Sequence, residues 1–429
     1  MGSLITALTT HDDPADSPDR HLSDEVCESV LASLRRRDQR HKGQLYVNGL
    51  LTAQGRKTMR NLATSTREPA AAQSLHHFIS VSTWGWPEVR ATLARRMERL
   101  MTPHAWVVRP MVTPKSGVHS VGVRRRFVRH LGQAVTSQYS HGLWLAGQQA
   151  AAPVNWQLSV EGAQLKGTLA GGHDAAPGVT DDAGRSSDDA GRSSDDARCS
   201  SDDTAVAVVQ QSASWGLAPR PVVMDARDVP PAPLIEAFTA AGLPFLLRVG
   251  SSTSLLAPDL SGGQRRLLSA PAEHLSTLAT SQQRPVEWVD PALPRSIRTS
   301  LVALMPVLWP GGAVPRRPRP AGVPVAGPRR TGGAELLLMG EWQPNRRRVA
   351  ELWLTNMTHA GRGTLLRLSK LTRRVDTDFA HICADVGAQD FEGRSYHGWH
   401  RHMTMVSLAH AVRVLAQENR VGEEWERSG

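Results

Sequence analysis

Acidic side chains are absent from one long stretch of this sequence. No Asp or Glu occurs between Glu98 and Glu161, although the 429-residue chain holds 40 of them. Because Mg²⁺ and other hard cations are bound by carboxylate oxygens, this stretch offers no acidic ligand to a metal site. Lysine is also scarce, with five residues, so nearly all of the positive charge is carried by arginine. Arginine suits bidentate contact with phosphate, although a GC-rich genome produces the same bias.

Cysteine is the next shortage. The three cysteines form no C-x-x-C pair, which excludes a disulfide framework and a cysteine-based zinc site and indicates a reducing compartment. They are Cys27, Cys199 and Cys383. Another pattern typical of metal sites, H-x-x-H-x-H, is formed by His397, His400 and His402. Without cysteine nearby, packing or phosphate contact is a better interpretation of these histidines than metal ligation.

Positive charge is abundant. The formal net charge is +10 and the sequence pI is about 10.3, so the surface is expected to attract polyanions. Nucleic acid is the commonest such partner, and membrane headgroups are the rival. At 429 residues, the chain is long enough for two or three folded units.

Targeting and membrane segments are missing. The first 20 residues contain early acids in place of the basic and apolar regions of a signal peptide. No run reaches the roughly 18 apolar residues expected of a membrane span. We therefore expect a cytoplasmic protein that does not act at a membrane.

The N-terminal part has helical periodicity. Residues 1–20 are expected to be disordered, and residues 21–103 to form a helical region that binds DNA. Helices are predicted over residues 22–40, 70–78 and 86–101. The polar face of the last helix is either solvated or in contact with phosphate. This face carries Arg90, Arg95, Arg96 and Arg99.

Short β-like runs follow, and residues 104–170 are assigned to the first part of a folded core. Residues 171–205 contain a seven-residue repeat of the type DDAGRSS without an apolar position. Such a repeat cannot form a coiled coil, so we predict a disordered insertion. The second part of the core covers residues 206–249, where an apolar strand over residues 221–226 contains Asp225 near its end.

A second insertion, rich in strands and loops, is predicted over residues 250–358. Residues 250–330 are rich in Pro, Gly, Ser and Arg and are expected to be mostly loop. Their basic cluster at residues 316–330 is either a linker or a DNA contact. Strands are predicted over residues 335–342 and 351–356. The C-terminal helical part of the core covers residues 359–420, and residues 421–429 form a tail.

Four segments in one order give a specific resemblance. They begin with the N-terminal run Gly55-Arg56-Lys57-Thr58, followed by Ser74-Leu75-His76-His77-Phe78, and continue with Pro114-Lys115-Ser116-Gly117, Val222-Val223-Met224-Asp225, and Val375-Asp376-Thr377-Asp378 with Phe391-Glu392-Gly393-Arg394. Together they resemble DDE-type insertion-sequence transposases, which cut and join DNA strands. The resemblance implies an α/β fold, in which a ribonuclease-H-like core follows a helical N-terminal region and is interrupted by the insertion between the second and third acidic positions.

The resemblance also implies site residues, a cofactor and partners. Asp225 and Asp376 match the second and third catalytic, metal-binding acids. An active member would use Mg²⁺ or Mn²⁺, bind double-stranded DNA at terminal inverted repeats and act as a homo-oligomer. The residues expected to contact DNA are Arg56, Lys57, Lys115, Arg373, Arg374, Arg394 and Arg401.

Four positions depart from the family pattern. Arg109 and Pro110 stand where the family has two adjacent aspartates, Asp376 stands in place of glutamate, and Cys383 replaces a lysine expected to steady the DNA backbone. Two-metal strand cleavage requires carboxylates that hold the cations, and an arginine repels them. We therefore predict impaired cleavage. An active enzyme with an unusual metal site, a non-catalytic repressor of transposition and a decaying gene product remain open alternatives.

Overall fold

The structure is a computed structural model, and its described residues are 18–66, 71–117, 120–128, 132–160, 193–258, 267–293, 296–310 and 334–428. Most of the predicted disordered start, residues 161–170 at the end of the first core part, residues 171–192 of the repeat region and the basic cluster at residues 316–330 lie outside this set. Within it, no helix is both long and apolar enough to cross a membrane.

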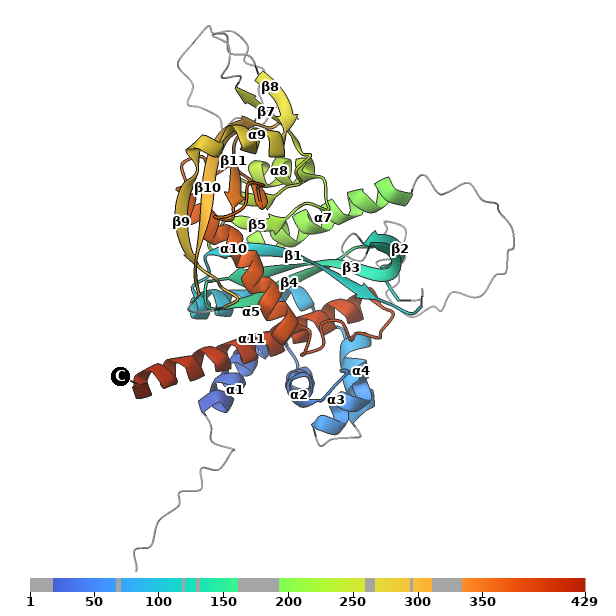
Figure 1. Cartoon of the computed structure of the whole chain (residues 1–429). Helices are drawn as coiled ribbons and strands as arrows, with labels where there is room; N and C mark the ends of the chain where they lie inside the picture. The colour runs from blue at the N-terminus through green and yellow to red at the C-terminus, as the bar shows by residue number, and fades with distance from the viewer. Residues whose placement is uncertain are drawn as a thin grey trace, which may run out of the picture.

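The N-terminal part consists of helices, as the periodicity predicts. They are α1 (Pro18–Leu31), α2 (Arg37–Thr52), α3 (Met59–Ser65), α4 (Ala72–Ser80) and α5 (Trp86–Met101). In α5, Pro87 and Glu88 in the first turn favour the helix start. All except α3 pack against the C-terminal helix α11 (Tyr396–Ser428), as Figure 1 shows in blue and red. Their buried side chains belong to the same apolar cluster as those of the sheet.

A large mixed sheet forms the centre of the molecule. Its first strands are β1 (Ala105–Pro114), β2 (Val123–Val128), β3 (Gln133–Ala146), β4 (Ala151–Leu158), β5 (Val222–Asp225) and β6 (Phe245–Arg248). Neighbouring strands follow the order β2-β3-β1-β5-β6, and β4 also pairs with β3. β3 is antiparallel to β1, whereas β5 and β6 run parallel to β1. This arrangement is consistent with a ribonuclease-H-like core.

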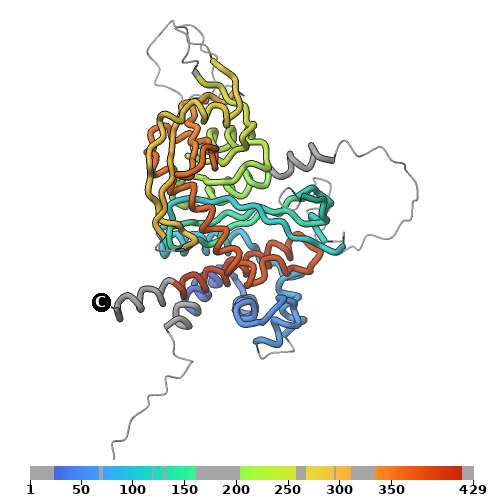
Figure 2. Tube along the Cα trace, viewed as in Figure 1, coloured from blue at the N-terminus to red at the C-terminus, as the bar shows by residue number. Residues whose placement is uncertain are grey.

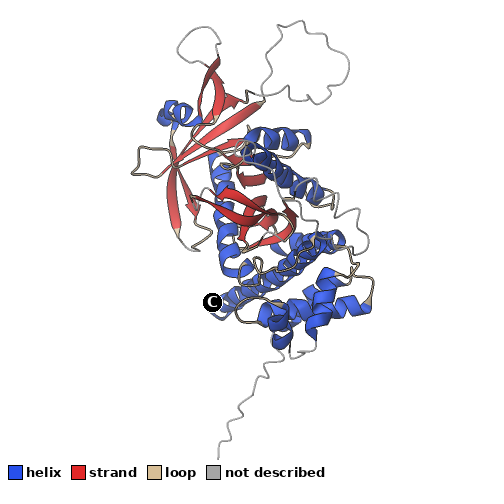
Figure 3. Cartoon of the chain, turned by 90° about the vertical axis from the view of Figure 1, so that its right-hand side faces the viewer, coloured by secondary structure: helices blue, strands red, loops and turns tan. Residues whose placement is uncertain are grey.

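Helices cover both faces of this sheet (Figure 3). They are α7 (Ser193–Ala213), α8 (Pro231–Ala240), α10 (Arg362–Asp378), the π-helical turn η4 (Phe379–Cys383) and α11. On β3, His141 contacts Thr204 of α7 at 2.9 Å. The next residue, Gly142, faces the ring of Trp156, which bonds Ser407 of α11 at 2.9 Å. Because neighbouring residues of a strand point to opposite faces, α7 and α11 lie on opposite sides of the sheet.

The second insertion continues the central sheet. Its elements are β7 (Ser254–Pro258), β8 (Leu267–Pro271), α9 (Ala272–Leu278), η3 (Thr280–Gln282), β9 (Arg284–Val289), β10 (Ile297–Leu308), β11 (Glu335–Trp342) and β12 (Glu351–Thr355). β12 pairs with β6, so the described strands join in one twelve-stranded sheet. The expectation that residues 250–330 are mostly loop is therefore wrong for residues 254–258, 267–289 and 297–308. The Pro, Gly and Arg content averaged over the whole segment concealed its strands.

Two further boundaries differ from the sequence prediction. α7 begins at Ser193, so the last part of the predicted disordered insertion is helical. Buried apolar side chains of α7, such as Val208, anchor the helix beside β3 and β4. α11 extends through Ser428, so the predicted tail continues that helix.

Candidate active site

Three neighbouring strands bring predicted site residues into one row. β1 and β5 pair Val108 with Met224, so Arg109 and Asp225 are the next residues along the two parallel strands. β5 and β6 pair Asp225 with Arg248. Side chains at matched positions of neighbouring strands share a face, so these three side chains lie side by side. The row is on the α11 face, because Arg109 pairs with Gly142 of β3.

The third acidic position faces this row from α10, which crosses β1, β5 and β6 (Figure 2). Arg109 Nε donates to Asp376 Oδ1 at 2.8 Å. The Arg109 guanidinium also lies 3.7 Å from the centre of the Phe379 ring. Arg109 is 22% exposed and Asp376 is 65% exposed. The structure thus joins the first and third predicted positions through an ion pair.

Asp225 is bound by arginines as well. Arg227 Nε lies 2.9 Å from Oδ1 and Nη2 lies 2.6 Å from Oδ2, a bidentate arrangement. This hydrogen bonding is the main reason that the pKa of Arg227 is raised. Arg248 Nη1 approaches Asp225 Oδ2 at 3.4 Å. The carboxylates at both remaining acidic positions, Asp225 and Asp376, therefore accept hydrogen bonds from arginine side chains of the same chain.

Charged groups continue from this row into the insertion. Arg248 lies 3.3 Å from Glu351 of β12, and Glu351 lies 3.3 Å from Lys370 of α10. Lys370 is 4% exposed and donates to Glu341 of β11 at 2.5 Å. Burial alone would raise the pKa of Glu351, but Lys370 and Arg248 hold it below its usual value. The acids around the candidate site are thus neutralised by internal cations.

A family model described as DDE superfamily endonuclease matches residues 29–314, more than half of the chain. This chain belongs to that family. The match includes Arg109 and Asp225, whereas Asp376 lies beyond its end. No curated protein matches the chain. DDE superfamily endonucleases act on DNA and use divalent metals.

The donor set of this DDE-family chain does not fit a pair of divalent cations. Across the described residues, no group of three or more His, Cys, Asp and Glu side chains could hold a metal. Asp225 and Asp376 each accept an arginine, and Arg109 adds a positive charge beside them. A cation entering here would meet electrostatic repulsion and would have to displace both ion pairs.

The histidine motif is a packing feature. His400 is buried and stacks on Trp86, with ring centres 4.8 Å apart. His402 Nε2 donates to the Gly387 carbonyl, and Nδ1 accepts from the Tyr46 hydroxyl at 2.9 Å. Burial lowers the pKa of His402 to about 4 and also lowers those of His397 and His400. These contacts support the packing interpretation over metal ligation.

Several residues expected to contact DNA are committed to protein partners. Lys57 is 4% exposed and its ammonium group donates to the Ala53 carbonyl. Arg401 is 6% exposed and donates to the carbonyls of Trp84 and Ile79, each at 3.2 Å. Their burial argues against direct phosphate contact, which corrects the prediction for both residues.

The other expected DNA contacts divide into two groups. Arg374 forms a bidentate ion pair with the buried Asp378, so its guanidinium is also engaged. Lys115 is half-buried and donates to the Phe391 carbonyl at 2.6 Å. The remaining three are exposed: Arg56, Arg373 and Arg394.

Two positions singled out in the sequence are buried, and one of them, Arg90, was expected on a polar helix face. Arg90, assigned to a polar helix face, is fully buried and donates to the Trp156 and His400 carbonyls, each at 2.8 Å. Cys383 is fully buried, and burial raises the pKa of its thiol. The Cys383 thiol is therefore enclosed by protein and is not on the surface.

Sequence reasoning missed the two arginines that bind Asp225. The sequence could have indicated Arg248, because Arg248 is the last residue of the next parallel strand and the carboxyl ends of neighbouring parallel strands lie side by side. Arg227 follows Asp225 by two residues, a spacing too common to indicate a bidentate pair.

Proposed function

We propose that this protein is a transposase-related, DNA-binding member of its family whose strand cleavage is lost or strongly impaired. The observation that carries the proposal is the 2.8 Å ion pair between Arg109 and Asp376. Strand cleavage by two metals needs carboxylates that bridge and flank the cations. Arg109 stands at the first of these positions, and its guanidinium forms an ion pair with the acid at the third position, Asp376. The acid-free stretch before Glu161 offers no substitute carboxylate.

Charge and family support DNA as the partner. The net charge of +10 is largely carried by arginine, and family members act on DNA. Terminal inverted repeats are the DNA that such a protein is expected to recognise, and it is expected to do so as a homo-oligomer. Mg²⁺ or Mn²⁺ would be required only if cleavage survived.

Binding and nicking assays test the two halves of this proposal separately. The purified protein should retard labelled duplex DNA, and its affinity should fall steeply as KCl rises. It should not nick supercoiled plasmid in Mg²⁺ or Mn²⁺ above the level of the Asp225→Ala variant. The alternative, an active enzyme with an unusual metal site, predicts nicking that Asp225→Ala removes.

A further inference from the structure

A cavity opens between α3, α4 and the loop before α11, and it shares no residue with the row formed by Arg109, Asp225 and Arg248. We name it the α3–α4 cavity. Its volume is about 360 Å³, within the roughly 300–1,000 Å³ range of small-ligand sites. Its lining residues are Lys57, Thr58, Met59, Arg60, His76, Ser80, Asp390, Phe391, Glu392 and Gly393.

Contacts between distant parts of the chain hold its walls in place. The Lys57 backbone N–H donates to Asp390 at 2.9 Å, and Arg56 pairs with Glu392 at 3.2 Å. Lys115, from the end of β1, donates to the Phe391 carbonyl at 2.6 Å. These contacts join three of the four segments that carry the family resemblance. None of the contacts involves Arg109, Asp225 or Asp376.

The loop itself is closely packed. A Cβ atom added to Gly393 would lie 2.3 Å from the Phe391 ring, so a larger residue there would force the ring to shift. Phe391 is 4% exposed and forms part of the wall. Phe391 and Gly393 thus pack closely together on this side of the cavity.

Cations outnumber acids around the α3–α4 cavity. Asp390 and Glu392 are both engaged, by the contacts described above. Arg60 and Arg394 are exposed, and neither has a side-chain partner among the described residues. Lys57 and Arg60 line the cavity, Arg56 and Lys115 contact its lining residues Glu392 and Phe391, and Arg394 follows the lining residue Gly393 in the chain. This surplus favours an anionic occupant, and arginine favours phosphate in particular.

We propose that the α3–α4 cavity binds the sugar-phosphate backbone of duplex DNA, with Arg60 and Arg394 in contact with phosphates. This inference rests on the proposed DNA-binding function. It places one DNA contact at the junction of the N-terminal helices and the loop that follows η4. Met59 and Phe391 provide apolar surface beside the phosphates, against which a sugar can pack.

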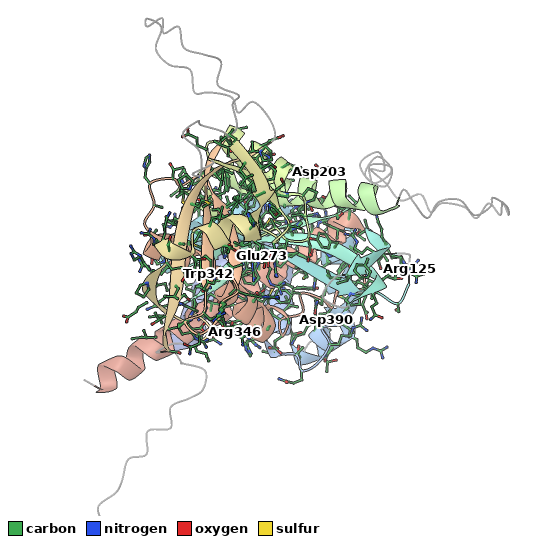
Figure 4. The ribbon with its side chains drawn as sticks, turned by 45° about the horizontal axis from the view of Figure 1, so that its top comes forward. Arg125, Asp203, Glu273, Trp342, Arg346 and Asp390 are labelled. Carbon is green, nitrogen blue, oxygen red and sulfur yellow. The ribbon has the colours of Figure 1, made fainter. Side chains whose placement is uncertain are left out.

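The test compares two double variants with the wild type. R60A/R394A removes the two unpartnered guanidiniums, and R346A/R347A removes two exposed arginines from the β11–β12 turn. Neither Arg346 nor Arg347 lines the cavity; Figure 4 labels Arg346 and the lining residue Asp390. All four side chains are exposed, so neither variant should unfold; thermal melts check this. A fluorescein-labelled duplex is titrated at several KCl concentrations.

R60A/R394A is expected to weaken binding about tenfold and to reduce the slope of log K against log[KCl] by about 2, one unit for each lost phosphate contact. R346A/R347A should keep the wild-type slope. An unchanged slope in R60A/R394A, or an equal loss in both variants, would overturn the cavity assignment while leaving the proposed function intact. A wild-type protein that binds no duplex would instead refute the proposed function itself.

Discussion

Arg227 holds the carboxylate of Asp225 at both oxygens, with Nε 2.9 Å from Oδ1 and Nη2 2.6 Å from Oδ2. A bidentate guanidinium occupies the oxygen lone pairs that a metal ion would use. Arg227 comes from the loop after β5, whereas Arg109 comes from β1 and binds Asp376. Arg227 therefore blocks metal binding at the second acidic position, Asp225, independently of Arg109.

The first prediction concerns recovery of metal binding. R109D restores a carboxylate in the row but leaves Asp225 bound by Arg227. We expect R109D to bind Mn²⁺ about tenfold more weakly than R109D/R227A, because the lost charge-assisted hydrogen bonds free Asp225. Calorimetric titration measures both affinities, and adding D225A to the double variant should abolish binding. Equal affinities for R109D and R109D/R227A would show that Arg227 does not close the site.

The second prediction concerns the Arg109–Asp376 pair as a link between β1 and α10. Asp376 is 65% exposed, so solvent screens the pair and its coupling energy should be only about 0.5 kcal/mol. The Phe379 contact of the same guanidinium adds about 0.5–1 kcal/mol. Urea unfolding of R109A, D376A and the double variant measures the coupling. R109A should therefore destabilise more than D376A, and the reverse order would contradict this assignment.

The third prediction concerns acid stability. Burial lowers the pKa of His141 to about 3 and those of His402 and His410 to about 4, from an ordinary value of 6.5. The unfolded chain therefore binds more protons than the folded chain below pH 6.5. The stability linked to these histidines is complete above pH 6.5 and is lost as the pH falls toward 4.

Urea unfolding at pH 7.0, 5.5 and 4.5 measures this loss, which should be on the order of 3 kcal/mol for a single buried histidine. H410Q keeps a donor for the Ala151 carbonyl that His410 contacts at 2.8 Å, but it cannot titrate. Its stability should depend less on pH than that of the wild type. H76Q makes the same substitution at an exposed histidine and is the control for the effect of the substitution itself.

The fourth prediction concerns Gly142 of β3, which pairs with Arg109 of β1. A Cβ atom here would lie 2.7 Å from the Trp156 ring, which is buried and held by Ser407. G142A is therefore expected to destabilise the fold by about 1–3 kcal/mol through overpacking. In G250A, the control, the nearest atom to the new Cβ is 3.9 Å away, so the free energy of unfolding should change little. Equal effects of the two substitutions would rule out the steric explanation.

Part of the site was predictable because its local patterns are strong. Val222, Val223 and Met224 form a continuous buried run, typical of a central parallel strand, and Asp225 is the first polar residue after it. Arg109 and Asp376 are 267 residues apart, and no local pattern connects them. Only the order of the family segments predicted that these two positions would meet. The consequence for catalysis remains a prediction.

Side-chain burial was less predictable. Arg401 lies in a run of basic and aromatic residues that suggests a surface, yet its carbonyl partners lie more than 300 residues away in sequence. Arg90 is buried for the same reason, since distant backbone carbonyls satisfy its guanidinium. A charge pattern identifies a cation but does not show which acceptors the fold will supply.

The pairing of β6 with β12 has a consequence for how this chain could have acquired its length. Val249 N donates to the Leu352 carbonyl at 2.9 Å, so the insertion leaves and rejoins the core at adjacent points. From the core, residues 250–351 are equivalent to the loop of a hairpin. A change in the length of this loop leaves the pairing of β6 with β5 in place. The strands β9 and β10 and the side chain of Glu341 pack on α10, so these parts of the insertion have to be kept if Asp376 is to stay beside Arg109.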